Sequence, residues 1–147
     1  MKKRILLTSF DTWLSNQISN SSDDMLIALA KMASTPHNLF YLHRLPVDIQ
    51  LASSRVIAKI KELEPDYILC CGMAASRQNL TVEALARSTS ILPGDTTENV
   101  LQTTIELKKL IAGTAAVEIS YDCGKFVCEG LYYSVLDYLQ QSQLSIP

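Results

Sequence analysis

Cys128 is the residue whose type and surroundings are best suited to chemistry. A strand is predicted before it, over residues 116–120. A helix is predicted after it, because apolar residues recur at steps of three and four: Cys128, Leu131, Val135 and Leu139. Gly124 allows a sharp turn between the two elements. Cys128 therefore falls in the first helical turn, where unpaired backbone N–H groups and the positive end of the helix dipole favour a thiolate. Because the thiolate is the nucleophilic form of cysteine, we expect covalent chemistry at this position.

The other cysteines lead to different interpretations. Cys70 and Cys71 lie in a continuous apolar segment, so core packing is expected of both. Cys123 is either a core residue or an exposed thiol able to pair with Cys128, which leaves a thiol redox protein as an alternative. Four cysteines in 147 residues do not indicate a disulfide framework. Neither histidine lies at ligand spacing from a cysteine, so we expect no metal site.

Length and charge limit the classes of function. A chain of 147 residues predicts one domain with a substantial core. The formal net charge of −2 gives no reason to expect nucleic acid or an anionic membrane as a partner. The apolar run at 5–7 is too short for the core of a signal peptide, and no run approaches the roughly 20 apolar residues of a membrane span. These features predict a cytoplasmic protein.

Short apolar runs, typical of strands, alternate along the sequence with longer segments whose apolar residues have helical spacing. The predicted strands cover residues 5–7, 39–42, 67–71, 79–87 and 116–120. The predicted helices run from 20–24 to a stop before Pro36, over 49–63, over 98–112 with Gly113 as the stop, and onward from 128. Predicted loops cover 8–19 and 88–97, the second with Pro93-Gly94 as its turn. This alternation indicates a single α/β domain over residues 1–147, a three-layer α/β/α sandwich with a mostly parallel central sheet.

Residues that could form a site collect at one edge of this predicted sheet, because ligands bind beyond the carboxyl ends of parallel strands. The loop that carries Phe10 and Trp13, the segment ending at Arg77, and Cys128 all follow predicted strands. Two aromatic residues in a polar loop favour a ligand wall over core anchors. Glu83 lies just beyond the second segment, and Arg77 either orients Glu83, stabilises an oxyanion or is a surface residue.

Six motifs, in the same order and at the same spacing, resemble those of the pyroglutamyl peptidase (pyrrolidone-carboxylate peptidase) family of cysteine peptidases. The resemblance covers nearly the whole chain. In this sequence the motifs read Ser9-Phe10-Asp11-Thr12-Trp13-Leu14-Ser15, Asn20-Ser21-Ser22, Leu45-Pro46-Val47, Gly72-Met73-Ala74-Ala75-Ser76-Arg77, Leu80-Thr81-Val82-Glu83 and Gly124-Lys125-Phe126-Val127-Cys128.

The resemblance implies a peptidase that removes N-terminal pyroglutamate from peptides, without any cofactor, by a Cys–His pair and an acidic residue. It assigns the nucleophile to Cys128 and the acidic residue to Glu83. The substrate-binding positions that it implies are the aromatic walls Phe10, Trp13 and Phe126 and the pocket-shaping residues Asn20, Met73 and Val127. A flat, neutral lactam suits an aromatic slot with a few polar groups. The expected partners are therefore peptides with N-terminal pyroglutamate, and self-association, common among relatives, is also expected.

The sequence departs from the family's pattern in the first loop and next to the cysteine. The loop's glycines are replaced by Ser9, Leu14 and Ser15, so a loop that relied on positive φ must take another path. Trp13 replaces a smaller aromatic residue. Glu129 places a negative charge beside the predicted nucleophile, which opposes thiolate formation.

The family's histidine lies in a strand downstream of the cysteine helix, whereas this sequence has only His37 and His43, which match no catalytic position. We therefore expect a shortened homologue that lacks the family's C-terminal strand and helix. Two hypotheses remain beside the redox alternative. One is a cysteine peptidase of the pyroglutamyl type that is feeble or inactive as this chain, and the other is a non-catalytic relative that keeps the fold as a binding or interaction protein.

Overall fold

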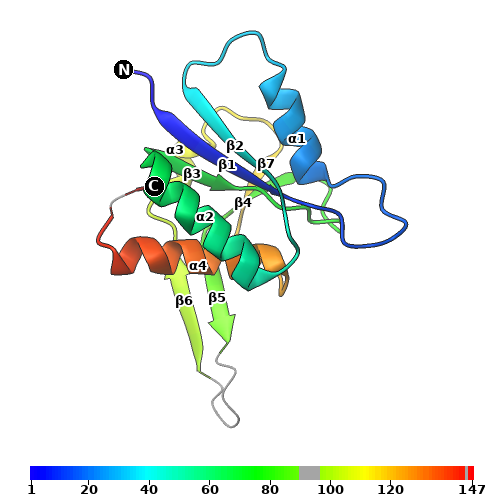
Figure 1. Ribbon diagram of the computed structural model, residues 1–147, viewed down its shortest axis with the longest axis vertical. Helices are drawn as coiled ribbons and strands as arrows, with labels where there is room; N and C mark the ends of the chain where they lie inside the picture. Colours follow the sequence, from blue (N-terminus) through cyan, green and yellow to red (C-terminus); the bar gives the residue numbers. More distant parts are fainter. Residues whose placement is uncertain (90–96, 145) are drawn as a thin grey trace. The chain divides into compact units, whose positions relative to one another are not determined.

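The computed structural model describes residues 1–89, 97–144 and 146–147, and the chain divides into two compact units. Unit 1 comprises Met1–Ala74 with Ile146–Pro147, and unit 2 comprises Ala75–Ser145. Both units contain parallel strand pairs together with helices (Figure 1). The predicted α/β class with a parallel sheet is confirmed, whereas the three-layer arrangement and the single domain stay predictions. In the described part of the chain, no helix combines the length and apolar character that crossing a bilayer requires.

Unit 1 is built on a three-stranded parallel sheet in the order β2-β1-β3. Its strands are β1 (Arg4–Phe10), β2 (Asn38–Leu45) and β3 (Tyr67–Cys70), joined by the helices α1 (Ser21–Ala30) and α2 (Ile49–Leu63). The side chains of Leu7 and Leu26 pack with Cys71 in a buried cluster. Each strand of the predicted order is present, and core packing of Cys71 is confirmed.

Strand β1 is longer than the sequence predicted, because Thr8, Ser9 and Phe10 continue it rather than starting the loop. Thr8 stays in register with β3, opposite Cys70. The buried Ser9 hydroxyl donates to Asp23 Oδ1 at 2.6 Å and accepts from the Arg44 backbone N–H at 3.0 Å. Ser9 can therefore extend the buried strand with its hydroxyl satisfied, whereas the buried Thr8 Oγ1 has no hydrogen-bond partner among the described residues.

Asn20 starts α1 as predicted, and its buried side chain makes three hydrogen bonds. Its Oδ1 accepts from the backbone N–H of Ser22 at 3.0 Å and from the Ser22 hydroxyl at 2.7 Å. Its Nδ2 donates to the backbone carbonyl of Asp11 at 3.2 Å. Asn20 thus ties the loop after β1 to the helix.

We expect Asn20→Ala to lower the free energy of unfolding by about 1–2 kcal/mol, since it removes the N-cap. Asn20→Asp keeps an oxygen for the Ser22 N–H but loses the donor to Asp11, so its loss should be smaller. Urea denaturation of the two variants and the wild type measures both values. Wild-type stability in Asn20→Ala would contradict the capping role.

Unit 2 contains a parallel pair, β4 (Leu80–Glu83) with β7 (Val117–Ser120), and an antiparallel pair, β5 (Leu85–Thr89) with β6 (Glu98–Gln102). Its helices are the short α3 (Leu107–Leu110) and α4 (Val127–Gln141). Helix α4 packs against β5 and β6 (Figure 1). Its predicted apolar stripe is confirmed by the burial of Leu131, Val135 and Leu139.

Two predictions in this unit are wrong. The single strand predicted over 79–87 is two strands, because the chain changes partner at Ala84: its N–H donates to the Ser120 carbonyl at 2.8 Å and its carbonyl accepts from Thr103 at 3.0 Å. The helix predicted over 98–112 is a strand at its start, since residues Glu98–Gln102 pair with β5. The helical part ends at Leu110 with Ile111 as its C-cap, so Gly113, whose φ is +81°, lies two residues beyond the cap and is not the predicted stop. The predicted Pro93-Gly94 turn lies outside the described residues.

Candidate active site

Cys128 lies in the first turn of α4, as predicted, and its side chain is half-buried. Gly124 has a φ of +76°, which confirms the sharp turn before the helix. The Gly124 N–H donates to Asp122 Oδ1 at 3.0 Å and so closes this turn. Phe126 occupies the N-cap, where its ring offers no acceptor to the first-turn N–H groups. Its place in the first turn puts Cys128 at the positive end of the helix dipole.

Glu83 is held at the end of β4 by Arg77. Arg77 Nη1 donates to Glu83 Oε1 and to Thr81 Oγ1, each at 2.5 Å. Glu83 Oε2 is buried and has no hydrogen-bond partner among the described residues. Of the three interpretations of Arg77, orientation of Glu83 is the one that these contacts support.

The backbone of Glu83 is also fixed, by a residue that sequence reasoning missed. The Tyr132 hydroxyl donates to the Glu83 carbonyl at 2.9 Å. Tyr132 lies four residues after Cys128 and therefore on the same face of α4. That spacing was a signal from which its proximity to the site could have been inferred.

Cys123 is a partly buried thiol that donates to the Leu85 carbonyl at 3.1 Å. Burial raises its pKa, and the negative charges of Glu83 and Glu129 raise it further. A thiol held in its neutral form is a poor attacking group. This environment favours the core interpretation of Cys123 over the redox alternative.

Glu129 has a structural role that the sequence did not reveal. Only 8% of its surface is exposed, and its Oε1 accepts from the backbone N–H of Arg87 at 3.1 Å. The carboxylate thus joins α4 to β5. Its partner is a backbone group that every non-proline residue carries, so no sequence signal identified it.

The predicted substrate-binding residues fall in both units. Phe10 is 3% exposed at the end of β1, while Trp13 in the following loop is 47% exposed. Gln17, which sequence reasoning missed, connects this loop to Met73: its Oε1 accepts from the Trp13 N–H at 3.0 Å and its Nε2 lies 3.9 Å from Met73 Sδ. These residues and Asn20 belong to unit 1.

The remaining predicted site residues, Glu83, Phe126, Val127 and Cys128, belong to unit 2. Phe126 is 74% exposed, so its ring is available for contact with a ligand. Val127 is half-buried at the first position of α4.

Ser9 and its neighbours explain how the first loop does without glycine. None of Ser9, Leu14 and Ser15 has a positive φ, so the substitutions carry no left-handed strain. The Asp23 Oδ1 that accepts from Ser9 also contacts His43 Nδ1 at 2.7 Å. Burial would raise the pKa of Asp23, but hydrogen bonds from Ser9 and His43 and the charges of His43 and Arg44 outweigh it and lower the pKa.

Both histidines make contacts within unit 1. His43 is bound to Asp23 and stacks on Tyr41 with ring centroids 5.5 Å apart. His37 Nδ1 accepts from the Lys3 backbone N–H at 3.5 Å. These contacts give His43 a structural role. Within the described ranges, no group of three His, Cys, Asp or Glu side chains is arranged to hold a metal ion.

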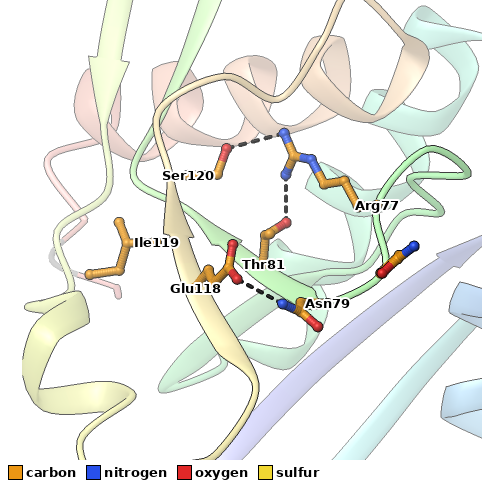
Figure 2. A pocket seen from close by; sticks show the side chains of 7 residues that line it. Arg77, Asn79, Thr81, Glu118, Ile119 and Ser120 are labelled. Atoms are coloured by element: carbon orange, nitrogen blue, oxygen red, sulfur yellow. Dashed lines mark hydrogen bonds between the residues drawn. The ribbon is translucent and has the colours of Figure 1, made fainter.

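Unit 2 also has an open, polar cavity of about 400 Å³ on the paired strands β4 and β7 (Figure 2). It is lined by Arg77, Gln78, Asn79, Thr81, Glu118, Ile119 and Ser120. Asn79 Nδ2 donates to Glu118 Oε1 across it at 2.7 Å. None of the predicted lactam-binding residues lines this cavity.

Solved structures of pyroglutamyl peptidases share the fold of this chain. Pyroglutamyl peptidase I from Bacillus amyloliquefaciens matches 96% of this chain and 75% of its own length, with a TM-score of 0.77 and 23% identity. A mutant pyrrolidone carboxyl peptidase from the hyperthermophile Pyrococcus furiosus matches with a TM-score of 0.76 and 18% identity, over 95% of this chain and 75% of its own.

The sequence itself is similar to curated pyrrolidone-carboxylate peptidases, although no family model matches it. The enzyme from Thermoanaerobacter sp. (strain X514) is 28% identical over 161 residues, covering 97% of this chain and 78% of the relative. That from Brevibacillus brevis is 26% identical over 163 residues, covering 98% and 74%. From this similarity along nearly its whole length, the chain is a homologue of the pyrrolidone-carboxylate peptidases.

Proposed function

We propose that this chain acts as a cysteine peptidase that removes N-terminal pyroglutamate from peptides, with Cys128 as the nucleophile. The observation that carries the proposal is the position of Cys128 in the first turn of α4, in the same unit as a Glu83 that Arg77 and Tyr132 hold in place. Helix N-termini favour thiolates. An oriented carboxylate can assist a cysteine nucleophile by orienting the general base that takes its proton.

In the proposed reaction, Cys128 Sγ adds to the carbonyl carbon that joins pyroglutamate to the next residue. The C–N bond breaks, the shortened peptide leaves as an amine that carries the proton given up by the Cys128 thiol, and a thioester remains on Cys128. Water then hydrolyses the thioester, which releases pyroglutamate and restores the thiol. No cofactor takes part in this sequence of steps.

For the substrate, we propose that Trp13 and Phe126 contact the faces of the lactam ring, that the buried Phe10 supports this wall from the core, and that Asn20, Met73 and Val127 shape the pocket. The 47% exposure of Trp13 and the 74% exposure of Phe126 support contact with a ligand. Both polar atoms of the Asn20 side chain are already hydrogen-bonded to Asp11 and Ser22, so Asn20 shapes the pocket by holding the loop rather than by bonding the substrate.

A second candidate is a non-catalytic relative that binds pyroglutamyl peptides. It is supported by the histidines, because the proposed reaction needs a general base and His37 and His43 are both engaged inside unit 1. The two candidates differ in turnover and agree in ligand.

The experiment compares release of aminomethylcoumarin from its pyroglutamyl amide and from its prolyl amide, which lacks the lactam carbonyl. We expect hydrolysis of the pyroglutamyl amide only, above the signal of a Cys128→Ala control. Equal signals from wild type and control would reject catalysis by this chain. In that case, chemical-shift changes in the control protein on addition of pyroglutamyl amide would support the binding protein, and their absence would reject it as well.

A further inference from the structure

One guanidinium group in unit 2 joins two segments that are far apart in sequence. Arg77 Nη1 contacts Thr81 and Glu83 on β4, while its Nη2 donates to Ser120 Oγ at 3.2 Å and to the Asp122 backbone carbonyl. Figure 2 shows the guanidinium between the Thr81 and Ser120 side chains. The second segment is the connection from β7 to α4, which leads to Cys128.

The connection held by Arg77 is itself a closed turn. Ser120 Oγ accepts from the Asp122 backbone N–H at 3.2 Å, and Asp122 Oδ1 accepts from the Gly124 N–H at 3.0 Å. Arg77 therefore binds at the start of a hydrogen-bonded path that ends at Gly124, two residues before the N-cap of α4. The same helix also contacts β4, because the Tyr132 hydroxyl donates to the Glu83 carbonyl.

From this closed set of contacts we infer that Arg77 is a positioning residue that couples the orientation of Glu83 to the placement of the turn before Cys128. The inference rests on the proposed function, and it adds a residue that touches no substrate. The planar fork of arginine can serve acceptors on both segments at once, whereas the ammonium group of lysine is a point charge without that geometry. A placement error near 1 Å is enough to cost about 10²-fold in rate.

Arg87 offers a matched control, because it binds the same connection without touching Glu83. Its Nη1 donates to the Tyr121 carbonyl at 3.0 Å and lies 3.9 Å from Asp122 Oδ1. If anchoring of the connection alone mattered, Arg77→Lys and Arg87→Lys would have equal effects. If coupling to Glu83 matters, only the first should impair the reaction.

The test measures covalent labelling of Cys128 by a pyroglutamyl chloromethyl ketone, which needs a placed nucleophile but neither a leaving amine nor turnover. We expect Arg77→Lys to lower the maximal labelling rate about 10- to 100-fold while the half-saturating concentration changes less than about threefold. Arg87→Lys should stay within about threefold of wild type. In a Glu83→Gln background, Arg77→Lys should have little further effect, because the group that it orients is altered.

The outcomes separate this inference from the function on which it rests. If Glu83→Gln slows labelling but Arg77→Lys does not, or if the two effects multiply independently, the positioning role is rejected and the proposed function stands. If the reagent labels Cys128 no faster than the matched prolyl chloromethyl ketone does, the proposed function is rejected and this inference with it.

Discussion

Cys128→Ala is expected to lower hydrolysis of a pyroglutamyl amide by at least about 10³-fold, because removal of a covalent nucleophile leaves only binding and orientation. Cys123→Ser, five residues earlier, is expected to leave the rate within about threefold. Burial and the charge of Glu83 raise the pKa of Cys123, so its thiol takes little part as a nucleophile near neutral pH. The initial rate of coumarin release from each variant measures both effects.

Alkylation by iodoacetamide provides a second measurement that does not depend on turnover. Burial raises the pKa of Cys71 from 9.0 to about 12, which lowers its thiolate fraction about 10³-fold. The greater intrinsic nucleophilicity of a basic thiolate recovers part of this loss, so about a 30-fold deficit should remain before limited access is counted. Peptide mass spectrometry at pH 7 should therefore find Cys128 labelled before Cys71 and Cys123. Labelling of Cys71 or Cys123 at the rate of Cys128 would contradict the assignment.

Local sequence signals predicted the parts of the fold that depend on neighbouring residues. Asn20 predicted the start of α1, and Gly124 with the stripe after Cys128 predicted the turn and α4. In each case the cap, the turn residue and the apolar period lie within a few residues of one another. These were also the features that placed Cys128 in the first turn of α4.

The errors arose where a distant partner decides the structure. Residues Glu98–Gln102 form a strand because β5 pairs with them, which overrides a helical reading of the segment. Ala84 interrupts an alternating pattern only because its backbone groups bind Ser120 and Thr103. Backbone pairing of this kind has no side-chain signature.

The candidate site shows the same division. The position of Cys128 could be predicted from local sequence. The contacts of Arg77 with Ser120 and Asp122 could not, because they span more than forty residues of sequence. The carboxylate of Glu129 was interpreted as a charge that opposes the thiolate, because its partner is a backbone N–H. A buried carboxylate that accepts a hydrogen bond is part of the support for α4.

Asp23→Ala is expected to lower the free energy of unfolding at pH 7 by about 2–3 kcal/mol, because it leaves the fully buried Ser9 hydroxyl without its acceptor and His43 without its partner. The Asp23 side chain is 13% exposed, so water cannot readily replace it. Asp23→Asn keeps an oxygen that can accept from Ser9 and loses only the charge. Asp23→Asn should therefore lower the free energy of unfolding by less than Asp23→Ala does. Urea denaturation of the two variants measures both losses.

The charge of Asp23 also predicts how this cost depends on pH. The groups that face it are Ser9 on β1 and His43 and Arg44 on β2, and they hold its pKa below the ordinary value of 3.8. A carboxyl whose pKa is lower in the folded state contributes its full stability above the unfolded pKa and loses it as pH falls through the folded pKa. The difference in unfolding free energy between wild type and Asp23→Asn should thus shrink as pH falls below about 4. A difference that stays constant down to pH 2 would mean that the ionised form of Asp23 gains nothing from Ser9, His43 and Arg44, and that hydrogen bonding alone holds the start of α1 against the sheet.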